Sequence, residues 1–197
     1  PIALLTTFTR DFDRVSMHGV RRELIHAQAD ALGLPLREVF MTAGANNVDY
    51  EAAMSAELLA LKAQGVSTIA FGDLFLADIR AYRERLLGRL GLTPLFPIWG
   101  RDTARLAREF IAQGFRATLC CVDTRVLPAE FAGREFHAEL LDALPATSDP
   151  CGENGEFHSF VQDAPDVRQA LDITVGAERR DESFVFRDLL PTSLTLP

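Results

Sequence analysis

The chain has 197 residues, which is enough for one large domain or for a main domain with a smaller one attached. Hydrophobic residues make up 48% of it and charged residues 24%, proportions that exclude a disordered or fibrous protein. No run of about 18 consecutive apolar residues occurs, and the start lacks the basic segment of a secretory signal. We therefore expect a cytoplasmic protein with no membrane contact.

The charge balance also limits the partners. Twenty Lys and Arg residues against 28 Asp and Glu residues give a net charge of −8, which disfavours a broad cationic surface for nucleic acid. The three cysteines, two of them adjacent, do not form a disulfide framework and suit a reducing compartment.

Strands and helices alternate along the first two thirds of the chain. Short apolar runs predict strands, and apolar residues at spacings of three and four predict helices that end at glycines. This alternation predicts parallel βαβ units, whose functional residues collect at the carboxyl ends of the strands. The predicted order is strand 2–7, helix 20–31, strand 36–41, helix 53–61, strand 66–71, helix 79–90, extended segment 93–98, a helix capped by Asp102, and strand 115–122.

The last third has a different pattern. A short predicted helix at 136–144 precedes three segments that are typical of strands joined by polar turns, at 156–162, 171–178 and 183–187. A mixed or antiparallel sheet is expected there.

Polar residues follow the predicted strands. Ser16 and His18 lie just before a helix, whose first N–H groups could bind an anion, although Ser16 could equally cap the helix beside a solvated His18. Gly72 and Asp73 follow the third strand, where a glycine allows close approach and a carboxylate could bind a ribose hydroxyl, a Mg²⁺ water or an amine. Asp78, on the next helix, could instead offset the helix dipole.

Two further segments stand out. Arg101 lies just before a helix N-terminus, a combination that suits phosphate or carboxylate, or else it pairs with a surface acid while Asp102 caps the helix. Residues 150–158, PCGENGEFH, hold two acids, a cysteine and a histidine. In an extended segment Glu156 and His158 would share a face and could orient an amine or move a proton.

The cysteines favour structural roles. Cys151 and His158 have no partner at metal-ligand spacing, and burial is a more frequent fate for a cysteine than nucleophilic catalysis. Cys120 and Cys121 alternate along a predicted strand and are expected in the core.

Three segments together resemble the signature segments of the diphthine–ammonia ligase family, also described as the DUF71 ATP-binding domain: 72–76 (GDLFL), 94–102 (PLFPIWGRD) and 150–161 (PCGENGEFHSFV). Residues 16–19 (SMHG) are similar to it too. The resemblance implies an α/β fold, an adenine nucleotide alpha-hydrolase-like parallel sheet with helices on both faces. This domain, of the PP-loop ATP pyrophosphatase group, would cover residues 1–98, and a smaller mixed α+β substrate domain would cover 99–197.

The resemblance also implies an activity. Members of the family adenylate a carboxylate with ATP, release pyrophosphate, and let ammonia displace AMP to form an amide, with Mg²⁺ on the phosphates. The acceptor is diphthine on elongation factor 2 in archaea and eukaryotes, and an undefined carboxylate in a bacterial member. Two alternatives stay open: a nucleotide-binding regulatory or interaction protein without catalysis, and a PP-loop enzyme acting on RNA, which the acidic balance disfavours. The oligomeric state stays open, a homodimer included.

Roles for individual residues follow from the same resemblance. The expected catalytic residues are Arg101, Glu153, Glu156 and His158. The expected nucleotide-binding residues are Thr6, Thr7, Phe8, His18, Gly72 and Asp73. The expected substrate-binding residues are Asp78, Arg83, Asp102, Cys151, Gly152, Asn154 and Gly155. No residue is expected to bind a metal directly.

One family feature has no counterpart in the sequence. The family's phosphate loop, a Ser-Gly-Gly-Lys-Asp-Ser string after the first strand, would lie upstream of Ile2. A glycine-rich loop of this kind cradles the pyrophosphate. We therefore expect either that the nucleotide-binding domain is incomplete at its N-terminus, or that this chain is inactive as a ligase.

Overall fold

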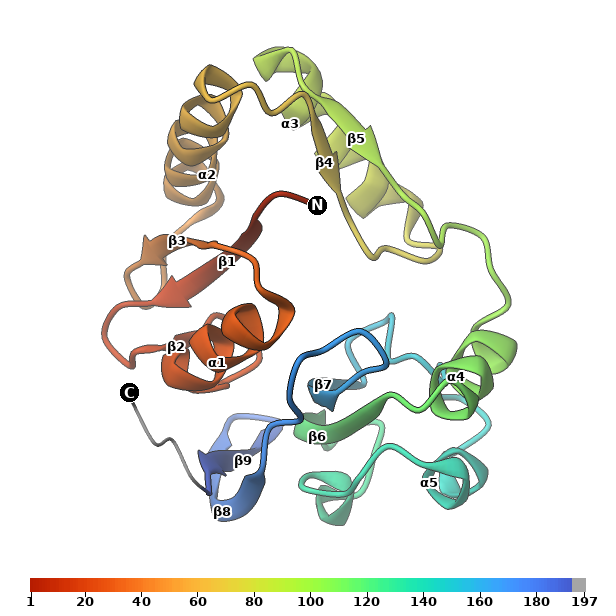
Figure 1. Cartoon of the computed structure of the whole chain (residues 1–197). Helices are drawn as coiled ribbons and strands as arrows, with labels where there is room; N and C mark the ends of the chain where they lie inside the picture. The colour runs from red at the N-terminus through yellow and green to blue at the C-terminus, as the bar shows by residue number, and fades with distance from the viewer. Residues whose placement is uncertain (193–197) are drawn as a thin grey trace.

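The computed structural model describes residues 1–192, whose strands form three small sheets (Figure 1). The first sheet has the order β2-β1-β3 and the second the order β4-β5. The third has four strands in the order β7-β6-β9-β8. The chain is therefore a mixed α/β structure.

Two parallel strand pairs confirm part of the predicted βαβ pattern, whereas the strand predicted at 115–122 lies in the antiparallel third sheet. β1 (Leu4–Thr9) pairs in parallel with β3 (Leu36–Met41), and α1 (Arg22–Leu32) connects them. β4 (Thr68–Ala70) pairs in parallel with β5 (Thr93–Leu95) across α3 (Ala77–Leu90).

Local signals set the helix ends. Gly33 and Gly91 end α1 and α3 in the left-handed conformation, at φ 68° and 64°, where glycine has no steric penalty. The side chain of Asn46 accepts hydrogen bonds at the N-terminus of α2 (Asn47–Ala63).

The helix α2 links the two parallel pairs and packs on both β3 and α3. Buried Met54 and Leu58 of α2 lie in one apolar cluster with Leu86 and Leu87 of α3. At the end of α2 the ammonium of Lys62 donates to the carbonyl of Leu90, 2.7 Å away. This bond helps to satisfy the free carbonyls at the C-terminus of α3.

Within residues 1–192 the parallel strands form two separate pairs and not the single sheet that the resemblance implies. β1 and β4 belong to separate sheets, and residues of both line a cavity of about 970 Å³. The remaining edge of β1 carries only the two-residue β2 (Arg14–Val15), which pairs antiparallel with Phe8 and Thr9. The two pairs therefore share no backbone hydrogen bonds.

The third sheet is antiparallel throughout, as one of the two alternatives for the last third predicted. It consists of β6 (Arg116–Asp123), β7 (Phe157–Asp163), β8 (Ile173–Asp181) and β9 (Phe184–Pro191). The largest apolar cluster joins it to α4 (Thr103–Ala112), the 3₁₀ turn Ala129–Phe131 and α5 (Ala138–Ala143).

Helix α1 packs against the same sheet. Val20 and Leu24 share a buried cluster with Cys120, Phe160 and Leu189. The sheet of the last third and the first βαβ unit are therefore joined through one helix.

The adjacent cysteines are both free and fully buried, which confirms their predicted place in the core. The register of β6 against β7 shifts between Leu119 and Cys121. This irregularity interrupts the simple alternation that the sequence predicts for Cys120 and Cys121. In the part of the chain that is described, no helix is long and apolar enough to cross a bilayer.

Candidate functional site

The three segments that resemble the family meet around the loop after β4. One carboxylate oxygen of Glu153 accepts hydrogen bonds from the backbone N–H groups of Leu74 and Phe75, at 2.7 and 3.3 Å. The carbonyl of Leu74 accepts from the N–H of Gly100 at 2.8 Å. Segments separated by up to about eighty residues along the chain are thus held together by direct hydrogen bonds.

Glu156 organises the loop before β7. Its side chain is buried, and its carboxylate accepts from the backbone N–H groups of Asp149 (2.8 Å) and Asn154 (3.0 Å) and from the Asn154 amide (2.9 Å). Three donors offset the cost of burying the charge. Strand β7 begins only at Phe157, so this carboxylate turns back into its own loop.

The glycine at 152 is required by its surroundings. Gly152 is buried with φ +70°, and a Cβ built there would lie 2.7 Å from the carbonyl oxygen of Phe157. Gly155 also has a positive φ, +87°, but a Cβ there would meet no atom within 4 Å. The loop therefore closes tightly at one glycine and stays open at the other.

Cys151 behaves as a structural thiol. Its Sγ donates to the carbonyl of Thr103 at 3.4 Å, which ties the loop to the start of α4. Burial raises the pKa of the Cys151 thiol to about 12, so the group stays protonated near neutral pH. This agrees with the structural role that the sequence favours.

His18 and His158 are brought together from opposite ends of the chain. Their rings stack with centroids 4.2 Å apart and planes 21° apart. Burial lowers the pKa of His18, and burial together with the neighbouring His18 lowers the pKa of His158 to about 4. Both imidazoles are therefore neutral near pH 7.

Apart from His18, the residues predicted to bind nucleotide lie on β1 and after β4. Thr6 and Thr7 are half-buried within β1, and the ring of Phe8 is fully buried beside Phe40. A Cβ on Gly72 would meet no atom within 4 Å, so a ligand has room to approach the backbone there.

Asp73, Asp78 and Arg83 surround the start of α3. The Asp73 carboxylate pairs with the Arg83 guanidinium through two contacts of 2.7 and 3.1 Å. The guanidinium also lies 4.3 Å from the ring centre of Phe71. Asp78 is exposed in the first turn of the helix, where it offsets the dipole.

Asp102 caps α4, as the sequence predicts. Its carboxylate accepts from the backbone N–H of Arg105 at 2.7 Å. Arg101, just outside the helix, pairs with Glu109, which also accepts from the Arg105 side chain at 2.7 Å. The Arg101 side chain remains 41% exposed, so it is accessible to an anion.

The structure also shows a residue that sequence reasoning missed. Asp188 on β9 binds the side chains of Arg14 and Arg21, which lie 174 and 167 positions away. No local pattern marks this carboxylate, because its partners are fixed only by the packing of α1 against the sheet. Among residues 1–192, no group of three or more His, Cys, Asp or Glu side chains could hold a metal ion.

The chain is similar to known proteins of diphthamide synthesis. Residues 102–189 match the family model described as the diphthamide synthase C-terminal domain. A Danio rerio protein named diphthine–ammonia ligase is 29% identical, across 88% of this chain and 75% of its own length. A Schizosaccharomyces pombe protein of the same name is 26% identical across 83% of this chain, which spans only 30% of that protein.

Proposed function

We propose that this chain acts as an ATP-dependent amide-forming ligase. It is a relative of the diphthine–ammonia ligases and has a diphthamide synthase C-terminal domain. The enzyme adenylates a carboxylate, releases pyrophosphate, and lets ammonia displace AMP. The acceptor is a carboxylate, for which the relatives' name gives diphthine as the example.

One observation carries this proposal beyond the similarity itself. The four segments that resemble the family are in contact: Glu153 binds the 72–76 loop, Gly100 binds the same loop, and His18 stacks on His158. A site that must bring a nucleotide, an acceptor and ammonia together needs such a junction.

The proposed division of roles follows the two halves of the chain. Residues 1–98 bind the nucleotide at the carboxyl ends of β1 and β4, with Thr6 to Phe8, His18, Gly72 and Asp73. Residues 99–197 hold the acceptor, and of these the structure describes the part up to 192. Mg²⁺ is carried by the phosphates of the nucleotide.

The site residues differ in how far their side chains remain available to a ligand. The carboxylates of Glu153 and Glu156 accept hydrogen bonds from backbone N–H groups. We therefore propose that both residues shape the loop that holds the acceptor. Arg101 is accessible and suits the phosphate or the acceptor carboxylate. His158 lies in the same segment as Glu153 and is neutral near pH 7, so it can accept a proton.

The finer fold, one adenine nucleotide alpha-hydrolase-like sheet, is part of the proposal. Both β1 and β4 line the cavity of about 970 Å³, and its walls include apolar side chains such as Leu4 and Ile69. An extended segment that pairs in parallel with both β1 and β4 would join the two pairs into one sheet. In that sheet the segment would lie between β3-β1 on one side and β4-β5 on the other.

The test is release of pyrophosphate and AMP from Mg-ATP with ammonium and candidate carboxylates, using the protein encoded by the complete gene. Turnover that needs all three substrates supports the ligase. Binding of ATP without pyrophosphate release would instead indicate a nucleotide-binding protein without catalysis.

A matched pair of variants tests the role of Arg101. Arg101 and Arg105 both pair with Glu109, but only Arg101 stands ahead of the N-terminus of α4. We expect Arg101→Ala to lower turnover roughly a hundredfold, because a charge that stabilises phosphate or carboxylate is lost. Arg105→Ala should stay within about twofold, and equal losses in both variants would contradict the assignment.

A further inference from the structure

The loop at residues 14–21 is closed on itself by backbone hydrogen bonds. The N–H of Val15 donates to the carbonyl of Val20 at 2.8 Å, and Arg14 and Arg21 form an antiparallel bridge. Met17 and Gly19 both have positive φ values, 69° and 71°, which allow the tight turn. The two ends of the loop are therefore side by side.

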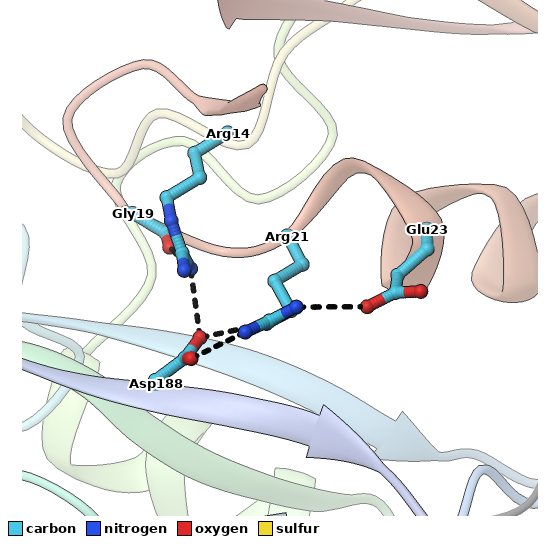
Figure 2. Close-up of polar contacts among 5 residues, drawn as sticks. All are labelled: Arg14, Gly19, Arg21, Glu23 and Asp188. Carbon is cyan, nitrogen blue, oxygen red and sulfur yellow. Dashed lines mark hydrogen bonds and ion pairs between the residues drawn. The ribbon is translucent and has the colours of Figure 1, made fainter. Parts of the chain in front are cut away.

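Both ends of this loop are bound to one carboxylate on β9. Figure 2 shows the guanidinium groups of Arg14 and Arg21 converging on the Asp188 carboxylate. Arg14 contacts one oxygen at 2.8 Å, and Arg21 contacts both oxygens at 2.9 and 2.6 Å. Arg14 also donates to the carbonyl of Gly19 at 2.9 Å. Two adjacent cations would repel each other without this carboxylate.

The contact between Asp188 and its two arginines shifts the pKa values of Asp188 and Arg21. The hydrogen bond from Arg21, reinforced by Arg14, lowers the pKa of Asp188 to about 2. The same pairing raises the pKa of Arg21. The Asp188 carboxylate and the Arg21 guanidinium are therefore both charged near neutral pH.

The tip of the loop rests on the same sheet. His18 stacks on His158 of β7, and Gly19 packs so closely on Phe186 of β9 that a Cβ would lie 2.7 Å from the ring. His158 is in register with Cys121 on β6, and the guanidinium of Arg179 on β8 lies 4.5 Å from the ring centre of Phe186.

We propose that Asp188 is a positioning residue of the proposed ligase site: by holding Arg14 and Arg21 it fixes loop 14–21 on the sheet, so that His18 covers His158. The role in the reaction rests on the proposed function. The position of the loop does not, because it follows from the contacts alone.

The deciding measurement is an NMR titration of the four histidines, assigned by single His→Asn variants. In the wild-type protein His158 should stay neutral down to about pH 4. Asp188→Asn should release the loop and expose the ring, so that the pKa of His158 rises towards its ordinary value of 6.5. Asp188→Glu should restore the low value at least in part.

Two further variants keep the test decisive. Arg21→Gln removes the two-point contact from the loop side and leaves the sheet intact, so it should raise the pKa of His158 in the same direction even if Asp188→Asn folds poorly. Asp172→Asn removes an equal charge from an exposed position before β8 and should change nothing. An unchanged His158 pKa in Arg21→Gln would overturn the proposal.

The activity assay separates this inference from the proposed function. If the wild-type protein is a ligase, Asp188→Asn should shift the acid limb of its pH profile upward with the pKa of His158, while Asp172→Asn keeps the wild-type profile. If the wild-type protein shows no turnover, the ligase proposal fails, and the NMR titration still decides the role of Asp188.

Discussion

The neutral imidazole of His158 ties stability to pH. Its pKa is about 4 in the folded protein and 6.5 when exposed, so the unfolded chain takes up a proton first as the pH falls. The stabilisation is complete above pH 6.5 and is lost between pH 6.5 and 4. We expect the free energy of unfolding in urea to fall by about 3 kcal/mol across this window.

A pair of histidine variants checks the source of this effect. His158→Asn should flatten the decline in the free energy of unfolding between pH 6.5 and 4. His137→Asn should keep it, because His137 caps α5 through its Nδ1 and asparagine also caps helices. An equal slope in wild type and His158→Asn would show that other groups carry the pH dependence.

Single residues were predictable where the signal is local. The cap at Asp102 and the terminating glycines at 33 and 91 follow from their neighbours in sequence. The stacking of His18 on His158 and the grip of Asp188 on its arginines were not predictable, because they depend on how distant elements pack. The assigned roles of Arg101, Glu153, Glu156 and His158 stay predictions.

The loop between α5 and β7 offers a prediction about an element. Gly152→Ala must relieve both a positive φ and a backbone clash at 2.7 Å, whereas Gly155→Ala meets only the positive φ. We expect Gly155→Ala to cost about 1 kcal/mol and Gly152→Ala clearly more, about 3 kcal/mol. Urea unfolding of both variants measures the difference, and equal costs would mean that the loop yields at Gly152.

Secondary structure could be predicted far better than its assembly into sheets. The strand at 36–41 was predicted with its observed bounds, and α1 and α3 end at the predicted glycines, whereas α2 already ends at Ala63, before Gly65. β2 was missed, because a two-residue strand has no periodicity and exists only through its pairing with Phe8 and Thr9. The parallel strands of residues 1–192 form two separate pairs, and the single sheet stays a prediction, because strand order depends on which strand edges meet.

At the scale of the whole molecule, α1 couples the two halves. Its Leu24 is buried with Cys120 and Phe160, and its Gln28 donates to the carbonyl of Val161 at 2.5 Å. A predicted boundary after residue 98 gives no hint of this coupling, because the apolar face of α1 does not specify the sheet that covers it. The division into two domains stays a prediction.

A leucine pair on this helix tests the coupling. Leu24→Ala should lower the free energy of unfolding by about 3 kcal/mol, because it leaves a cavity between the helix and the sheet. Leu32→Ala, at a position 41% exposed on the same helix, should cost less than about 1 kcal/mol. Similar losses in both variants would show that α1 contributes to stability through helix formation alone.

The bond from Lys62 to the carbonyl of Leu90 has a practical consequence. Lys62 is the sole lysine of the 197 residues, and the other basic side chains are arginines. Amine-reactive dyes and acylating reagents would therefore mark one side chain of this sequence, at the junction of α2 and α3. The modification would neutralise the cation that faces the end of α3, so the label would also report on that junction.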